Sequence, residues 1–173
     1  MLIRRAMQGD EAAIAKVYVN SWKTTYQNII PETYLNGLEA GLYSNIWSFI
    51  LNEEKTIVYV AENAEGEIVG FASGGNEQTE DPHYTGEVYA IYILQNYQRK
   101  GIGKSLIKRL LKELRSQGYV NLIIWALKDN HNRSFYESFG GTIKKTKPFL
   151  VSGASLTEVG YVWENIDEVL NEL

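Results

Sequence analysis

The chain has 173 residues, of which 45% are hydrophobic and 22% charged, with a net charge of −4 and an isoelectric point of about 5.3. This composition is ordinary for a soluble globular protein, and the length predicts one domain over residues 1–173. The lack of cysteine excludes disulfides, thiolate metal sites and a cysteine nucleophile, and with only two histidines we expect no bound metal. An acidic chain without a signal peptide or a long apolar run predicts a cytoplasmic protein with no nucleic-acid or membrane partner.

The first third of the chain reads as one strand and three helices. A short strand is expected over residues 2–6, after which Gly9-Asp10 provides a turn and an N-cap. Apolar and aromatic residues at helical spacing predict a helix that reaches Tyr26. A short helix is expected to start at Pro31, and another to cover residues 42–51.

A hairpin and a central strand follow. The β-branched run over residues 56–61 and the return segment 67–74 predict an antiparallel pair joined by a turn. Residues 75–85 are polar and rich in turn formers, so they are expected to form a loop. The apolar segment 87–94 then reads as the central strand.

The last part alternates strands and helices. We expect a helix over residues 100–117, a buried strand over 121–127, a helix over 130–139 and a terminal strand pair over 142–151 and 158–163. Because a strand–helix–strand crossover produces parallel pairing, the central strand should pair in parallel with the strand that follows its helix. The sequence therefore predicts an α/β (α+β) fold with a mixed sheet and helices on both faces.

The segment Gln98 to Ser105 indicates a phosphate ligand. Glycines at 101 and 103 open the helix beside Arg99, Lys100 and Lys104, and free backbone N–H groups at a helix start bind anions. The P-loop pattern would need glycine at position 98, which is Gln, and the dinucleotide pattern would need glycine at 106, which is Leu. Each of these two motifs is missing one residue.

The segment 98–103 instead fits the pattern Q/R-x-x-G-x-G/A, and it resembles the pyrophosphate loop of the GNAT superfamily of acetyl-CoA-dependent N-acetyltransferases. Residues 130–140 resemble a second GNAT motif, N-x-x-x-x-F-Y-E-x-x-G, although they end in Phe-Gly-Gly where the family often has Gly-Phe. The layout of residues 21–35 is also similar to that of many GNAT proteins. The expected element order matches the GNAT fold along essentially the whole chain, which implies a splayed pair of parallel strands.

This resemblance implies a binding cleft for acetyl-CoA. The backbone of residues 91–93 would line the acetyl-pantetheine arm, and an N–H near Ile93 would bind the thioester carbonyl. Asn130 would bind the pantetheine arm or serve as an ordinary N-cap. The residues expected at the cofactor are Ile91, Tyr92, Ile93, Gln98, Arg99, Lys100, Gly101, Ile102, Gly103, Lys104, Ser105, Asn130, Arg133 and Tyr136.

The resemblance also implies catalytic roles. Tyr136 would protonate the leaving thiolate, since a tyrosine hydroxyl has a pKa of about 10 and is protonated at pH 7; the alternative is an ordinary half-buried helix tyrosine. Glu87 would be the general base, with His83 as a weaker candidate, and the alternative for Glu87 is an exposed strand residue. The expected acceptor pocket contains Trp22, Tyr26 and Tyr89, although the aromatic core is the simpler place for Trp22.

The expected activity is acetyl transfer to a primary amine of a small molecule, peptide or protein. Without cysteine no acyl-cysteine intermediate can form, which favours direct attack in a ternary complex. Glu77, Glu80 and Asp81 could attract a cationic acceptor, but a solvated loop is the simpler expectation. Two alternatives stay open, namely a non-catalytic acyl-CoA-binding module and a nucleotide-binding protein. The β-rich C-terminal segment is a candidate surface for a homodimer.

Overall fold

The computed structural model describes residues 1–53 and 55–173. In this part of the chain, seven strands form one sheet with the order β1-β2-β3-β4-β5-β7-β6. The strands are β1 (Leu2–Arg5), β2 (Ile57–Glu62), β3 (Ile68–Asn76), β4 (Gly86–Ile93), β5 (Leu122–Leu127), β6 (Thr142–Val151) and β7 (Ala154–Trp163). The helices are α1 (Glu11–Thr25), α2 (Glu32–Asn36), α3 (Ala40–Glu53), α4 (Ile102–Ser116), α5 (Ser134–Glu137) and α6 (Ile166–Glu172), with a 3₁₀ turn, η1 (Gln95–Tyr97).

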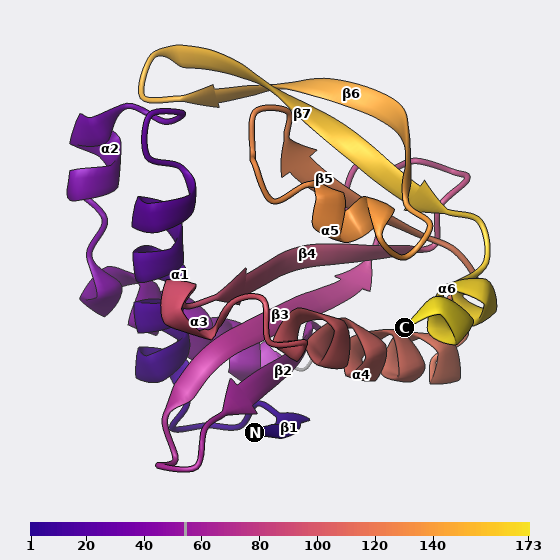
Figure 1. Cartoon of the computed structure of the whole chain (residues 1–173), viewed down its shortest axis with the longest axis horizontal. Coiled ribbons are helices and arrows are strands. Elements are labelled where there is room, and N and C mark those ends of the chain that lie inside the picture. Colours follow the sequence, from indigo (N-terminus) through magenta and orange to yellow (C-terminus); the bar gives the residue numbers. More distant parts are fainter. Residues whose placement is uncertain (54) are drawn as a thin grey trace.

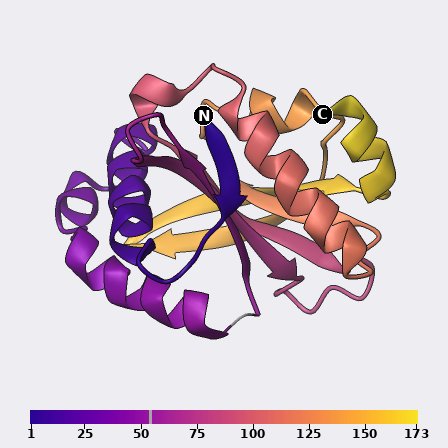
Figure 2. The same cartoon turned by 90° about the horizontal axis from the view of Figure 1, so that it is seen from below.

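Helices cover both faces of the sheet. Figures 1 and 2 show α1 and α3 on one face and α4 on the other, with α5 and α6 on the α4 side. The α4 face is held by leucines at helical spacing, Leu106, Leu110 and Leu114, which are fully buried against the sheet. The predicted mixed sheet with helices on both faces is therefore confirmed.

The pair β4 and β5 is parallel and splays apart. Their pairing covers only Gly86–Val88 of β4 and Leu122–Ile124 of β5, although both strands run further. Directly after the paired part, the register between β3 and β4 shifts, so that Tyr89 has no partner on β3. Such a bulge bends a strand and strengthens its twist. The bend separates the second half of β4 from β5.

The splay leaves part of the β4 backbone without a strand partner. The N–H of Leu94 donates to the carbonyl of Val69 at 2.9 Å, so the backbone N–H of residue 94 points toward β3. Because backbone groups alternate along a strand, the N–H groups of Ile91 and Ile93 point the other way, toward the gap. The gap therefore has backbone donors on one wall.

Three local expectations need correction. Asp10 stands at the start of α1 but does not cap it, because its carboxylate binds the Arg4 guanidinium and accepts the Met7 N–H. The helix expected over 130–139 is one turn, α5, because the Asn130 side chain accepts the Asn132 N–H and forms a polar turn first. The helix α6 was not expected. It is short and is capped by Asn165, which accepts the Asp167 N–H.

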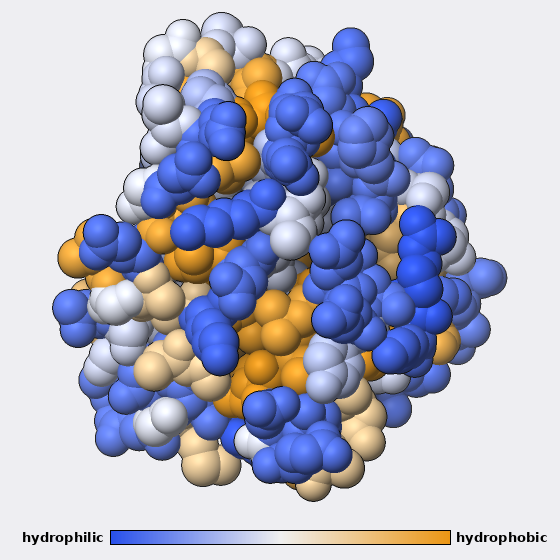
Figure 3. Space-filling view, turned by 60° about the vertical axis from the view of Figure 1, so that its left-hand side comes forward, coloured by the Kyte–Doolittle hydropathy of each residue, from blue (hydrophilic) through white to orange (hydrophobic). Residues whose placement is uncertain are grey.

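Part of the apolar surface remains exposed. Leu42, Ile46 and Phe49 of α3 are 63%, 51% and 62% exposed. Figure 3, which brings the side with α1 to α3 forward, shows apolar patches framed by hydrophilic side chains. In the described part of the chain, no helix has both the length and the apolar character that a membrane span requires.

Candidate active site

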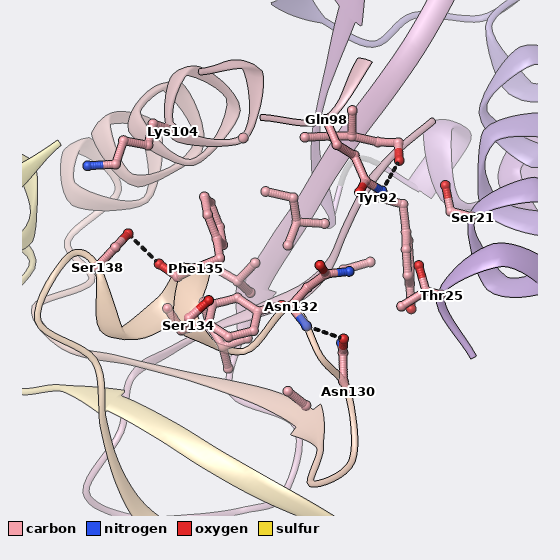
Figure 4. A pocket seen from close by; sticks show the side chains of 18 of the residues that line it. Ser21, Thr25, Tyr92, Gln98, Lys104, Asn130, Asn132, Ser134, Phe135 and Ser138 are labelled. Carbon is pink, nitrogen blue, oxygen red and sulfur yellow. Dashed lines mark hydrogen bonds between the residues drawn. The ribbon is translucent and has the colours of Figure 1, made fainter. Parts of the chain in front are cut away.

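A cavity of about 460 Å³ lies where β4 and β5 separate. Its walls come from β4, β5, α1, the start of α4 and the segment 130–138. Figure 4 shows Ser21 and Thr25 on the α1 wall beside Tyr92, with Lys104 and Phe135 further along the cavity. Residues that were expected at the site and line the cavity are Tyr26, Tyr89, Ile91, Tyr92, Ile93, Gln98, Arg99, Gly101, Gly103, Lys104, Asn130 and Tyr136. The structure thus brings together the two sequence motifs and the central strand.

The loop before α4 presents free backbone donors to this cavity. Arg99 and Gly101 have left-handed φ angles of 60° and 79°, which turn the chain sharply into the helix. In the described residues, no backbone group accepts the N–H of Arg99, Lys100 or Gly101, and the N–H groups of the first helical turn have no partner within the helix. The loop therefore forms a concave set of N–H donors suited to an anion.

Side chains of the loop have different roles from its backbone. The Gln98 amide donates to the Ile93 carbonyl at 3.0 Å, which fixes the loop to the end of β4. Ile102 is buried in the core, and the Ser105 hydroxyl donates to the Gly101 carbonyl at 3.1 Å. The Lys100 ammonium lies 5.4 Å from the centre of the Tyr97 ring. The side chains of positions 100, 102 and 105 do not line the cavity.

The two motifs meet at Gly103. A Cβ at this position would lie 3.0 Å from two atoms of the Phe135 ring and 3.4 Å from Cδ1 of Ile93. Glycine therefore permits the second motif to approach the start of α4. Phe135 was not singled out as a site residue, although it lies inside the recognised motif.

Tyr136 lines the cavity and is 9% exposed, so it is buried and not half-buried as an ordinary helix tyrosine would be. Its ring lies 5.3 Å from the ring of Tyr161. Burial raises the pKa of Tyr136 above its ordinary value. The hydroxyl is therefore protonated throughout the physiological pH range and can donate a proton.

Two more tyrosines line the opposite side. The hydroxyls of Tyr26 and Tyr92 are 3.5 Å apart, and burial raises the pKa of both groups. Trp22 packs on Tyr26, with ring centres 5.0 Å apart, and it does not line the cavity. The Tyr89 hydroxyl turns away to donate to the Asn76 carbonyl at 2.6 Å.

Glu87 is buried, at 8% exposure, so the alternative interpretation of this residue as an exposed strand residue is wrong. One carboxylate oxygen accepts the Gln78 N–H at 3.0 Å, and burial raises the pKa of this carboxyl. Glu87 does not line the cavity itself, but its neighbour Val88 does. The Glu87 carboxylate therefore has no direct contact with the cavity, and a role as general base would need a bridging water.

Two further candidates lie outside the cavity lining. His83 is exposed and its Nε2 lies 2.7 Å from Glu164. The Arg133 guanidinium donates to the Tyr161 hydroxyl at 3.2 Å, and its Nε has no partner among the described residues. Arg133 would have to leave Tyr161 to reach a phosphate.

Several lining residues were missed by the sequence interpretation. They come from α1, β5 and the segment after it: Ser21, Thr25, Trp125, Asn132, Ser134, Phe135 and Ser138. Most are small polar residues in helices or turns, and no local pattern distinguishes them from solvent-exposed residues. Only their position within the second motif gave a signal for Asn132 to Ser138.

A model of the acetyltransferase (GNAT) family matches residues 22–141, which contain both motifs. The chain belongs to the GNAT family. An uncharacterised N-acetyltransferase of Bacillus subtilis, YuaI, is 35% identical over 164 residues, which cover 95% of this chain and 93% of the relative. Membership of this family makes the chain an acyltransferase.

Solved structures share the GNAT fold. The PaiA N-acetyltransferase of Thermoplasma acidophilum, crystallised with coenzyme A, superposes with a TM-score of 0.73 at 20% identity and covers 91% of this chain and 96% of its own. YncA of Salmonella typhimurium, solved with acetyl-CoA, gives 0.71 at 23% identity, with 95% and 93% covered. At this identity the likeness supports the fold alone.

Proposed function

We propose that this GNAT protein transfers the acetyl group of acetyl-CoA to a primary amine by direct attack in a ternary complex, and that residues 1–173 act as one domain. The observation that carries the proposal is the cavity between the splayed strands. It joins the free N–H groups before α4 at one end to the buried Tyr136 and Tyr26 hydroxyls at the other.

The cofactor would lie along the free edge of β4. Its pyrophosphate would accept hydrogen bonds from the backbone of residues 99–104, with Arg99 and Lys104 adding positive charge. The N–H groups of Ile91 and Ile93 would bind the pantetheine amides and the thioester carbonyl, and Asn130 would contact the same arm. A backbone donor at the carbonyl stabilises the oxyanion that forms during attack.

In the chemical step, the neutral amine nitrogen would bond to the thioester carbon, the carbon–sulfur bond would break, and the thiolate would take a proton from Tyr136. The proton that the nitrogen then loses to become an amide would return through water to the Tyr136 phenolate, which restores the hydroxyl. The amine must lose its proton before attack, because an alkylammonium has a pKa of about 10.4. Glu87 would accept that proton through water, and its raised pKa brings it closer to neutral pH, where a general base is most effective.

Calorimetry and thermal shift with acetyl-CoA, CoA and ATP test the cofactor. We expect both CoA species to bind and ATP to bind far more weakly, because the P-loop pattern is incomplete. Saturation at a hundred times the dissociation constant should add about 2.7 kcal/mol to the free energy of unfolding. Binding of ATP without CoA would overturn the proposal, and CoA binding without turnover of any amine would favour the non-catalytic module.

Glu87→Gln tests the base. The variant keeps the size of the side chain and an oxygen for the Gln78 N–H, so we expect the fold and the affinity for acetyl-CoA to be unchanged. Turnover with an amine should fall by about a hundredfold, which is the lower range of general-base contributions. Steady-state kinetics at neutral pH measure this, and an undiminished kcat would remove Glu87 from the reaction.

A further inference from the structure

A charged cluster borders the cavity beside Trp125. It consists of Glu77, Glu87, Glu158 and Lys147. The Lys147 ammonium lies 3.4 Å from a Glu158 oxygen, across the β6–β7 pair, and both Lys147 and the two other glutamates act electrostatically on Glu87. Lys147 thus pairs directly with Glu158 and acts on Glu87 at longer range. Glu87 and the Glu158 side chain, at 8% and 17% exposure, are largely withdrawn from water.

Trp125 supplies an aromatic face in the same place. The Lys147 ammonium stands 4.2 Å from the centre of the Trp125 ring, well within the range of a cation–π contact. Trp125 lines the cavity. An ammonium group between this ring and Glu158 therefore occupies a position at the edge of the candidate active site.

The Lys147 side chain is suited to leave this position. It comes from β6, an edge strand of the sheet, and it is 35% exposed. Because its stem is long and flexible, the Lys147 ammonium can reach water when another ammonium takes over its contacts with Glu158 and Trp125. The subsite would then be open to an ammonium from a bound molecule.

Ser21 provides a separate observation on the opposite wall. It is 1% exposed, and its hydroxyl has no hydrogen-bond partner among the described residues. Figure 4 shows its side chain extending from α1 toward Tyr92. A buried hydroxyl without a partner is costly, and it can accept a hydrogen bond from an amine N–H.

The two ends of the cavity therefore differ in charge. Arg99 and Lys104 line the cavity near α4. Glu158 and Glu87 do not line it, but they lie close to lining residues: Glu158 acts electrostatically on Tyr26, and Glu87 is next to Val88 on β4. The basic end suits the phosphates of the cofactor. The acidic end suits a cationic acceptor, since opposite charges attract and a carboxylate on the acceptor would meet the carboxylates of the buried Glu87 and the partly buried Glu158.

We propose that the acceptor is a small amine with a second cationic group, a diamine or polyamine, whose second ammonium replaces that of Lys147 between Trp125 and Glu158. This inference rests on the proposed acetyltransferase function. It names the substrate class of the same site, in which one amine reaches the thioester and the other is held at the charged cluster.

Three amines of equal chain length test the class with acetyl-CoA: 1,4-diaminobutane, butylamine and 4-aminobutanoate. They differ only in a terminal ammonium, methyl or carboxylate group. We expect kcat/KM for the diamine to exceed that for butylamine by about threefold or more, because the second ammonium exchanges with that of Lys147 and gains only the difference between the two sets of contacts. Equal rates for the first two amines, or preference for 4-aminobutanoate, would overturn the inference.

Lys147→Met gives the sharper test, because the direction of its effect depends on the acceptor. If a second ammonium must displace Lys147, removing the lysine lowers KM for 1,4-diaminobutane by about threefold or more. If Lys147 instead binds a carboxylate on the acceptor, Lys147→Met does not lower KM for the diamine, and it raises KM for 4-aminobutanoate. The latter result would contradict the proposal.

Lys145→Met is the matched control. Lys145 lies on the same strand but pairs with Asp81 and stands over Tyr84, away from Trp125. We expect no change in KM for any of the three amines. Glu158→Gln should raise KM for the diamine and leave that for butylamine unchanged, and a uniform change for both amines would count against the subsite.

Calorimetry of the free protein with 1,4-diaminobutane separates this inference from the proposed function. If 1,4-diaminobutane binds and its binding weakens in Glu158→Gln, the subsite is supported, whether or not acetyl-CoA binds. If acetyl-CoA does not bind, only the acetyltransferase proposal fails. An absence of diamine binding, together with normal acetyl-CoA binding and no preference for the diamine in turnover, would overturn the inference alone.

Discussion

Gly103→Pro is expected to weaken acetyl-CoA binding by about ten- to a hundredfold, because it removes a backbone N–H that would donate to a phosphate, and a hydrogen bond to a charged group contributes about 1.5–3 kcal/mol. Position 103 is the second residue of α4, so this N–H makes no bond within the helix. The substitution should therefore leave the helix largely intact. Calorimetry with CoA measures the loss, and circular dichroism verifies the fold.

Gly103→Ala is the control for that substitution. Both variants place a Cβ 3.0 Å from the Phe135 ring, but alanine keeps the N–H. We expect alanine to cost part of the affinity, through displacement of Phe135, and proline to cost clearly more. If the two variants bind CoA equally well, the N–H of residue 103 is not a phosphate donor.

Tyr136→Phe is expected to lower kcat by about a hundredfold or more, the range in which general acids contribute, with little change in the dissociation constant of acetyl-CoA. Only the hydroxyl is lost, and the ring can keep its packing against Tyr161. Single-turnover kinetics with an amine acceptor would measure the chemical step directly. A variant with the full rate at neutral pH would exclude the acid role.

The pH dependence gives a second readout for Tyr136. Because burial raises its pKa above the ordinary value, the donating form persists to higher pH than for a free tyrosine. The rate should therefore show no decline due to this residue between pH 7 and about 10, the ordinary tyrosine pKa. A decline that begins near pH 8 and disappears in Tyr136→Phe would contradict the structure.

Tyr161→Phe is the matched control for Tyr136→Phe. The Tyr161 hydroxyl donates to Glu137 at 2.7 Å and accepts from Arg133, and it does not line the cavity. This variant should lose some stability and keep its kcat. If both variants slow the reaction equally, the effect arises from packing of the tyrosine pair and not from proton transfer.

Much of the fold was predictable because it depends on patterns within a few residues. The leucine spacing of α4 and the β-branched run of β2 specify their elements locally. The short elements were less predictable: α5 is one turn and α6 has seven residues. For such lengths, side-chain caps and docking on neighbouring elements decide the structure, and neither appears in periodicity.

The sequence by itself determined the glycines at 101 and 103, the order of the two motifs and the family that they identify, since these depend on spacing along one segment. Only the tertiary structure decided that β4 and β5 separate at the Tyr89 bulge, that Glu87 is buried, and that Lys147 stands over Trp125. The reason is physical. A turn or a helix start depends on the backbone preferences of adjacent residues, whereas burial, charge clustering and a free strand edge depend on which distant segments pack together.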